Sequence, residues 1–364
     1  MTTGDTMLSS PGQAAPAPDS AQEVHLARIE SREARSHRIS TSILIAIMAV
    51  LMLALVPRTS GTAQFSFLDS LSGKDLGTAK LPGLPTVLVS GILCALAAVA
   101  FAFKRSHGWI GTIAGVVAGV TVVVGLLTWA AAGASLPFQV SSQLEGTISL
   151  ATPLILGALC GVMCERSGVV NVAIEGQMLT AAFAAALVGS MTQSIAAALV
   201  AAVLAGVLMG ALLALFTIKY LVDEVVMGVV VNLFASGLTG FLFNQLLVTD
   251  AEKYNAAPIM EPIAIPGLSR IPFLGPILFN QTVLVYIGFL CIALVWFLLW
   301  CTRWGLRIRS VGEHPEAADT VGISVTAVRW SAVLVGGVFA GLGGAYFTIG
   351  TVGAFSKNIT AGTG

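Results

Sequence analysis

Residues 303–325 read RWGLRIRSVGEHPEAADTVGISV and lie between two long apolar runs of the chain. The stretch is short, charged and rich in helix-forming residues, and its acidic side chains recur every three positions from Glu313. This spacing places them on neighbouring turns of one helical face, and Gly322 is a typical helix stop. The sequence therefore predicts a small amphipathic helix over 313–322, held at the surface of a membrane bundle where a soluble partner could move it.

The composition fixes the class of protein. Hydrophobic residues make up 56% of the 364 residues and charged residues only 10%. These values are far from those of soluble domains and are typical of a polytopic membrane protein. The formal net charge is zero, so nothing in the charge balance indicates a nucleic acid partner.

Apolar runs of the length needed to cross a bilayer, about 20 residues, recur along the chain. Nine candidates are present, at about 40–57, 84–103, 108–133, 144–164, 172–190, 194–217, 222–247, 277–301 and 327–350. The predicted fold class is therefore all-α: a polytopic transmembrane helical bundle of about nine spans with a short cytoplasmic helix.

Three regions follow from this pattern. Residues 1–39 are rich in Pro, Ala and Ser and then in interleaved charges, which predicts a disordered cytoplasmic N-terminal tail. Residues 40–143 hold the N-terminal membrane spans. Residues 144–364 hold the remaining spans together with the helix at 313–322.

Basic residues predict the orientation of the bundle. With the N-terminus in the cytoplasm, twelve of the 18 Lys and Arg residues fall on the inside and six on the outside. Cytoplasmic loops carry the excess of basic residues in membrane proteins. We therefore expect nine crossings, with the N-terminus inside and Gly364 outside.

Small residues predict where the spans pack closely. Gly-x-x-x-Gly spacings occur along the chain, among them Gly115–Gly119, Gly206–Gly210 and Gly337–Gly341. Such spacings let helix backbones approach each other without an intervening Cβ, although glycine is also simply common in membrane helices. The crowding of five glycines between positions 336 and 344 predicts that the last span is buried in the bundle.

A polar island, CERSGVVNVAIEGQML at 164–179, interrupts the apolar pattern. Asn171 and Glu175 are four residues apart and so share one face of a helix, Gln177 lies in the same island, and a Ser-Gly pair marks a break before them. Polar groups beside the hydrocarbon are costly and are hypotheses of function by default. We assign Asn171, Glu175 and Gln177 to a substrate pathway. A purely structural role, with Glu175 held by a backbone donor, stays open.

Asn232 lies within the span that follows the charge cluster of Lys219, Asp223 and Glu224. The two acids fit a helix start, where they complement the helix dipole. An amide inside a membrane needs a hydrogen-bond partner. Asn232 is therefore either a link between helices or a further substrate contact, and we add it to the pathway with both alternatives open.

The sequence contains no motif for catalysis. The stretch SGKD at 72–75 lacks the upstream glycine and the hydroxyl residue of a Walker A phosphate-binding loop. The four histidines are scattered outside the spans, and the five cysteines lie in or beside apolar runs without the ligand spacing of a metal site. We therefore expect a non-enzymatic membrane protein with no metal or cofactor of its own.

Three stretches resemble one protein family: GVVNVAIEGQMLTAAFAAALVG (168–189), DEVVMGVVVNLFASGL (223–238) and GEHPEAADTVGISVTAVRWSAVLVGGVFAGLGGAYF (312–347). They are similar to permease subunits of bacterial ABC importers, in the group that includes branched-chain amino acid and ribose-type permeases, and within it to the nucleoside permeases. The resemblance implies that the helix at 313–322 is a cytoplasmic coupling helix. The implied residues for docking an ATPase are Glu313, Pro315, Glu316, Ala317, Ala318 and Gly322.

The same resemblance implies partners and a location. We expect a cytoplasmic ATPase subunit that carries ATP and Mg, a second permease subunit in a heterodimer, and an extracytoplasmic substrate-binding lipoprotein. The small-molecule substrate would be a nucleoside or a related ribosyl compound, and the location the cytoplasmic membrane of a bacterium, among lipids and without nucleic acid. A simple-sugar permease is the alternative in the same class. An ion-coupled secondary transporter, with Glu175 as the ion site, and a membrane scaffold are alternatives from other classes.

The chain departs from the family pattern at both ends. Its first 143 residues are longer and more divergent than the family core. It also stops at NITAGTG (358–364), where family members continue with a further apolar segment. We therefore expect the sequence to be truncated at its C-terminus.

Overall fold

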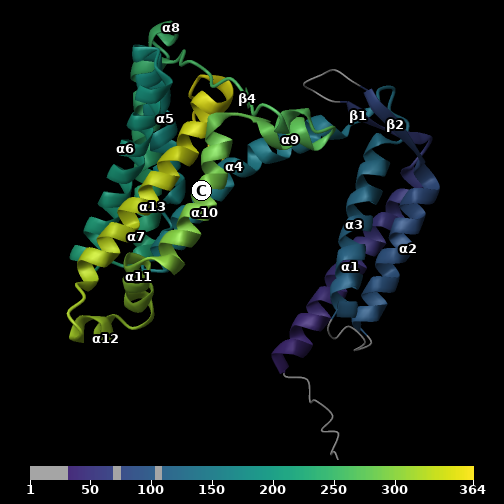
Figure 1. Cartoon of the computed structure of the whole chain (residues 1–364), viewed down its shortest axis with the longest axis horizontal. Helices are drawn as coiled ribbons and strands as arrows, with labels where there is room; N and C mark the ends of the chain where they lie inside the picture. The colour runs from purple at the N-terminus through teal and green to yellow at the C-terminus, as the bar shows by residue number, and fades with distance from the viewer. Residues whose placement is uncertain (1–31, 69–74, 103–108) are drawn as a thin grey trace, which may run out of the picture. The chain divides into compact units, whose positions relative to one another are not determined.

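The structure is a computed structural model that describes residues 32–68, 75–102 and 109–364 (Figure 1). The predicted tail lies outside the described residues as far as residue 31. The same holds for three of the basic loop residues used to predict the orientation: Lys74, Lys104 and Arg105.

The chain divides into two compact units, and each is described by itself. The first holds the described residues up to Ala63 together with Lys80–Ser135, and the second holds Gln64–Ala79 and Leu136–Gly364. The regions predicted from the sequence, at 40–143 and 144–364, stay predictions.

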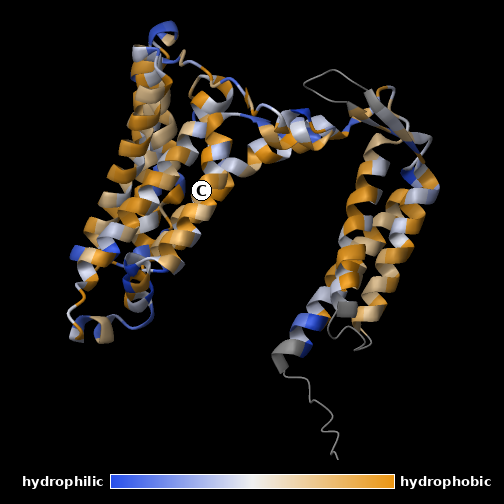
Figure 2. Cartoon of the chain, in the orientation of Figure 1, coloured by the Kyte–Doolittle hydropathy of each residue, from blue (hydrophilic) through white to orange (hydrophobic). Residues whose placement is uncertain are grey.

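Within the described residues, nine helices are long and apolar enough to cross a membrane, which confirms the predicted fold class and number of spans. Hydrophobic residues predominate along most of these helices (Figure 2). The helices are α1 (Arg32–Leu55), α2 (Gly83–Ala102), α3 (Trp109–Ala131), α4 (Val140–Glu165), α5 (Ile174–Thr192), α6 (Ile195–Ala214), α7 (Glu224–Leu242), α10 (Val283–Cys301) and α13 (Val325–Phe347). Since α1 begins at Arg32, residues 32–39 of the predicted tail are helical.

Shorter elements connect these spans. One-turn helices of π geometry extend α6, α7 and α13: η2 (Leu215–Lys219), η3 (Phe243–Leu247) and η5 (Thr348–Val352). The remaining short helices are η1 (Val56–Arg58), α8 (Ala251–Tyr254), η4 (Leu268–Arg270), α9 (Leu274–Phe279), α11 (Arg303–Glu313) and α12 (Pro315–Thr320).

Short strands form two small sheets that the sequence analysis did not predict. The first has the order β2 (Asp75–Pro82), β1 (Thr62–Leu68), β3 (Phe138–Gln139). Phe65 pairs with Phe138 in parallel register, and their rings meet edge to face with centroids 5.9 Å apart. The second sheet pairs β4 (Ile263–Ala264) antiparallel with β5 (Asn280–Gln281).

In the first unit, α1, α2 and α3 pack against one another. A Cβ added at Gly91 would lie 2.8 Å from the Leu53 side chain, so α1 and α2 are in close contact there. Arg38 of α1 donates hydrogen bonds to the carbonyl groups of Phe101, at 3.2 Å, and Ala102. These carbonyls end α2 and have no partner within the helix, so Arg38 closes its last turn.

In the second unit, α13 lies against α4, α5 and α6 (Figure 1). Most of this helix is buried, as the glycine crowding predicted. The glycines of α6 and α13 meet directly: a Cβ at Gly206 would lie 2.5 Å from the Gly337 carbonyl oxygen and 2.8 Å from the Gly341 Cα. Two predicted Gly-x-x-x-Gly contacts are therefore confirmed. The one at Gly115–Gly119 is wrong for the described residues, because a Cβ at Gly119 would have nothing within 4 Å.

After α13 the chain turns back along α5 and α7. Phe355 packs edge to face on Phe183 of α5, with ring centroids 5.4 Å apart, and its backbone exchanges hydrogen bonds of 2.7 and 3.0 Å with the Asn255 side chain. The chain ends at Gly364, beside Glu175 and about halfway along the helices (Figure 1). The side of the membrane on which Gly364 lies stays a prediction.

Candidate functional site

The first candidate site is the pair of short helices between α10 and α13. The first of them, α11, buries Gly305, Ile308 and Val311 on one face and exposes Arg307 on the other. Thr302 caps its start by accepting a hydrogen bond of 3.0 Å from the Gly305 N–H. A helix with one apolar and one charged face is stable at a membrane surface.

The predicted single helix over 313–322 is wrong in one respect. Glu313 is the last residue of α11, His314 breaks the helix, and Pro315 begins α12. Proline is favoured at a first helical position, where its missing N–H has no helical partner to lose. Glu313 therefore does not share a helical face with Glu316.

The end of α12 follows the prediction. Gly322 has a φ of +83°, a left-handed conformation that favours glycine. The Ile323 N–H donates to the Ala318 carbonyl at 3.0 Å, and the Gly322 N–H donates to Asp319 at 2.9 Å. This is the Schellman arrangement, which satisfies the last carbonyls of the helix and stops it.

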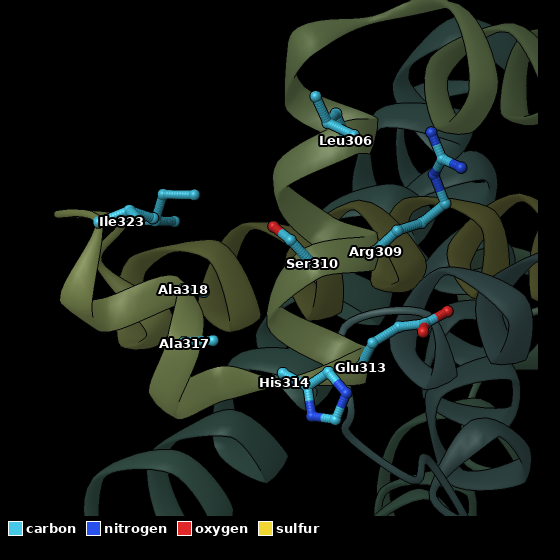
Figure 3. Close-up of a pocket in the computed structure, with 9 residues that line it drawn as sticks. Leu306, Arg309, Ser310, Glu313, His314, Ala317, Ala318 and Ile323 are labelled. Atoms are coloured by element: carbon cyan, nitrogen blue, oxygen red, sulfur yellow. The ribbon is translucent and has the colours of Figure 1, made fainter. Parts of the chain in front are cut away.

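The two helices enclose an open groove of about 430 Å³ (Figure 3). Leu306 and Ser310 line it from α11, and the methyl group of Ala317 points into it from α12. Leu306 is 60% exposed, and Val321, which also lines the groove, is 74% exposed. Apolar side chains exposed together on a charged surface element are typical of a protein contact site.

The six predicted docking residues differ in how accessible they are. Ala318 is buried and packs into the main core of the second unit, whereas the neighbouring Ala317 is exposed. Pro315 is half-buried, and the remaining three are exposed on the surface: Glu313, Glu316 and Gly322. Ala317 is therefore the small residue at which a bulky side chain would affect a partner without disturbing the core.

Arg309 fixes α11 against the membrane bundle. Its guanidinium group lies over the Trp300 ring of α10, 4.3 Å from the ring centroid. A cation in this position is attracted by the ring quadrupole. The contact therefore holds α11 to the end of the span α10.

The second candidate site is the polar island. The break predicted there is present: α4 ends at Glu165 and Gly168 has a φ of +79°. However, α5 begins only at Ile174, so Asn171 precedes the helix. The expectation that Asn171 and Glu175 share a helical face is therefore wrong.

Asn171 and Gln177 meet in a buried polar cluster with two cysteines of α4. The Asn171 Nδ2 donates to Cys160 Sγ at 3.3 Å, to Cys164 Sγ at 3.6 Å and to Gln177 Oε1 at 3.4 Å. Its Oδ1 accepts from the Ala173 N–H at 3.0 Å, just before α5. Gln177 is fully buried, and its Nε2 has no partner among the described residues. The cluster ties the start of α5 to α4.

Asn232 links α7 to the start of α5. Its Oδ1 accepts from the Gly176 N–H at 2.7 Å, and its Nδ2 donates to the Val172 carbonyl at 2.8 Å. The Gly176 N–H belongs to the first turn of α5, which has no partner within the helix. Asn232 therefore has the geometry of a helix-to-helix link.

The carboxylate of Glu175 receives three hydrogen bonds from the end of the chain. The donors are the hydroxyl of Thr360 and the N–H groups of Gly362, at 3.0 Å, and Gly364, at 2.8 Å. Thr360 is fully buried and Glu175 is half-buried. Two of the three donors are backbone N–H groups, as expected if Glu175 has a purely structural role.

The four predicted pathway residues lie together around the start of α5: Asn171, Glu175, Gln177 and Asn232. They do not share one helical face, and hydrogen bonds from α4, α7 and the segment after α13 hold them there. Three participants escaped the sequence analysis. Cys160 and Cys164 lie in an apolar run and were given no role, although their spacing of four places both on the face that meets the island. Thr360 lacks any local signal, because its partner lies 185 positions away.

Comparison with known proteins identifies the family. A family model described as the permease component of the branched-chain amino acid transport system matches residues 143–364, which include both candidate sites. The chain belongs to this permease family. No solved structure matches the permease.

Individual relatives of the permease are also permeases. The nucleoside ABC transporter permease protein NupC of Lactococcus lactis is 41% identical over 225 residues, which cover 58% of this chain and 69% of that protein. The guanosine ABC transporter permease protein NupQ of Bacillus subtilis is 41% identical over 228 residues, or 60% and 70% of the two chains. The putative glucose ABC transporter permease protein TsgC13 of Haloferax volcanii is 33% identical over 222 residues, or 61% and 67%.

Family membership and the candidate spans together confirm three predictions. The chain is a multi-pass membrane protein and a transport component of an ABC system, and it is not itself an enzyme. The work of transport is therefore divided between this permease and other subunits of the system.

Proposed function

We propose that the permease belongs to an ATP-driven importer that moves nucleosides or related ribosyl compounds across the cytoplasmic membrane of a bacterium. The observation that carries this proposal is the 41% identity with permeases named for nucleosides and for guanosine. Family membership also favours an ABC importer over an ion-coupled secondary transporter.

The docking pair α11 and α12 supplies the mechanical input. We propose that a cytoplasmic ATPase, which binds ATP and Mg, seats on the exposed residues Glu313, Glu316, Ala317 and Gly322. Ala318 and the Arg309–Trp300 contact then hold the pair rigidly to the bundle. A rigid connection suits this role, because closure of the ATPase then moves α11 and α12 without being absorbed by a loose loop.

Two further partners complete the proposed importer. A second permease in a heterodimer is supported by a pair of relatives in Bacillus subtilis, the guanosine permeases NupQ and NupP, which are 41% and 28% identical to this chain. An extracytoplasmic binding lipoprotein would deliver the substrate and set most of its selectivity.

We place the substrate pathway along the polar side of α7. Asn232 is half-buried, and Ser236 one turn later is exposed beside the exposed Asn358. Such polar groups are costly against lipid, so this side faces a water-filled path or another subunit. Behind it, Asn171, Gln177 and Glu175 act by holding the start of α5 in place.

The docking proposal is tested by Ala317→Trp. A bulky side chain overpacks a close contact, which typically costs about 1–3 kcal/mol. We expect this variant to reach normal abundance, to lose the ATPase on co-purification and to lose uptake. Thr326→Trp is the matched control, because Thr326 is also exposed but lies on α13 outside the groove. Normal co-purification of the ATPase with Ala317→Trp would remove the docking surface from the account.

The substrate proposal is tested by uptake in cells with and without the gene. We expect radiolabelled guanosine to accumulate only with the gene, and labelled ribose and glucose to accumulate equally in both. The relative named for glucose makes a simple-sugar permease the second candidate. Gene-dependent accumulation of a sugar without guanosine would favour that candidate and overturn the nucleoside proposal.

A further inference from the structure

One short segment touches both candidate sites. Residues 166–173, called the linker below, connect α4 to α5. On one side the linker meets the docking helix α11 and the start of α13, and on the other side it carries the groups that hold α5. The two sets of contacts lie on neighbouring residues of one short, irregular stretch.

The docking side of the linker is a contact between backbones. A Cβ added at Gly312, one residue before the end of α11, would overlap the Arg166 carbonyl oxygen and lie 3.3 Å from the Gly168 nitrogen. A Cβ at Gly168 would in turn lie 3.4 Å from the Gly312 Cα. Packed backbones cannot yield as side chains can, so a displacement of α11 here must displace the linker.

Arg329 adds a second connection from the first turns of α13. Its Nε donates to the Ser167 carbonyl at 3.3 Å, and its Nη2 would lie 3.3 Å from a Cβ at Gly168. Because α13 follows α12 directly in the chain, Arg329 moves with the docking element. The linker is therefore held from α11 and from α13 at the same point.

The other side of the linker positions the start of α5 and reaches α7. The Val170 N–H donates a hydrogen bond to the Glu224 carboxylate at the start of α7. The Asn232 side chain, also on α7, donates to the Val172 carbonyl and accepts from the Gly176 N–H. The Asn171 amide joins the buried cluster on α4. A shift of the linker would therefore change how the start of α5 sits against α4 and α7.

We propose that the linker transmits movement of the docking helices to the pathway, with Gly312 and Arg329 as the residues that position it. This rests on the proposed ATP-driven function. Long-range coupling requires an element whose arrangement both sites bias, and the linker is in direct contact with both. Glycine at 312 permits the backbone contact, and Arg329 keeps the linker seated when α11 moves.

The test measures the linker itself. Val170 is 46% exposed, so Val170→Cys in a Cys301→Ser background reports linker movement through its rate of thiol labelling in inside-out vesicles. Vesicles that contain the complex with its ATPase are labelled without nucleotide and after trapping with ATP and vanadate. We expect the labelling rate to change by at least about fivefold, the lower end of typical coupling between sites.

Two variants then break the connection in different ways. Gly312→Ala adds volume at the backbone contact, and Arg329→Gln removes the guanidinium without adding volume. In both we expect the ATPase to co-purify normally while the nucleotide-dependent change in labelling is lost; Arg329→Lys should restore part of it. Arg303→Gln is the control, because Arg303 is exposed and makes none of the linker contacts.

Each outcome decides the proposal. A wild-type response in Arg329→Gln overturns it, whatever Gly312→Ala does. Failure of both variants to accumulate in the membrane also overturns it, since the contacts would then serve assembly instead of coupling. The readout needs no substrate, so a complex that responds to nucleotide but does not import guanosine would reject the substrate proposal and leave the linker proposal standing.

Discussion

Gly206→Ala tests the packing on which the account depends, because α13 carries the docking element into the bundle and Gly206 sets its distance from α6. A methyl group at position 206 would lie 2.5 Å from the Gly337 carbonyl oxygen and 2.8 Å from the Gly341 nitrogen. These are backbone atoms, so relief requires α6 and α13 to move apart. Gly210→Ala is the matched control one turn away, where the nearest atom would lie at 3.4 Å, an ordinary contact.

The comparison of the two variants isolates the cost of overpacking. Replacing glycine by alanine within a helix favours the helix by about 1 kcal/mol, and both variants share that gain. Overpacking a tight contact costs about 1–3 kcal/mol. We therefore expect Gly206→Ala to be less stable than Gly210→Ala by this amount, which corresponds to a drop of roughly 2–12 °C in the unfolding midpoint for a unit of this size.

The assay is thermal unfolding of the detergent-purified permease, followed by size-exclusion chromatography after heating, together with guanosine uptake in cells. Gly206→Ala should show the lower midpoint and the lower uptake, and Gly210→Ala should resemble the unaltered permease in both. Equal midpoints for the two variants would refute the close approach of α6 and α13.

Three further predictions concern the pathway and the topology. Asn232→Leu removes two hydrogen bonds to the start of α5, each worth about 0.6 kcal/mol in a membrane, and should lower the unfolding midpoint; Ser236→Ala, whose hydrogen bond is 3.5 Å long, should not. Glu175→Gln keeps one acceptor oxygen of the three-donor contact and should reduce guanosine uptake in a transport assay without making it depend on a proton gradient. A cysteine at Glu252 should be labelled from outside intact cells, and one at Glu316 only from the cytoplasmic side.

Each of these predictions has a result that contradicts it. Unchanged stability in Asn232→Leu would mean that its two hydrogen bonds are replaced from elsewhere. Normal uptake in Glu175→Gln would mean that transport does not need the Glu175 contacts at the start of α5, and a new proton dependence would favour an ion-coupled transporter. Labelling of both cysteines from outside, in the Cys301→Ser background, would reject the predicted orientation.

The helices could be predicted from the sequence because bilayer thickness imposes one requirement on every span. Each run of about 20 apolar residues therefore became a helix, including the fifth, in which the polar island meets the apolar run. The contact between Gly206 and Gly337 was likewise predictable in kind, since small residues at a spacing of four favour close packing. The helix that packs against Gly206 could not be predicted. The same spacing at Gly115–Gly119 makes no comparable contact among the described residues, so the spacing alone does not identify a partner helix.

The candidate sites were predictable only in part, because periodicity assumes an unbroken helix. Proline at 315 is compatible both with continuing the helix from Glu313 and with starting a new one, and the structure has the second. Gly168 signalled a break, but the sequence does not tell how many residues pass before α5 begins, so Asn171 was placed on the wrong element. Contacts such as Glu175 with Thr360 depend on the return of the chain after α13, which has no local signature.

The central claim, an ATP-driven permease for nucleosides, is tested most directly by reconstituting the complete complex in proteoliposomes. The measured quantity is the initial rate at which labelled guanosine, supplied with the binding lipoprotein, is moved to the side on which α12 lies. We expect transport only when ATP is present on that side, at a rate that a protonophore does not change. Transport at the same rate without ATP, or transport that stops when the proton gradient is collapsed in the presence of ATP, would contradict it.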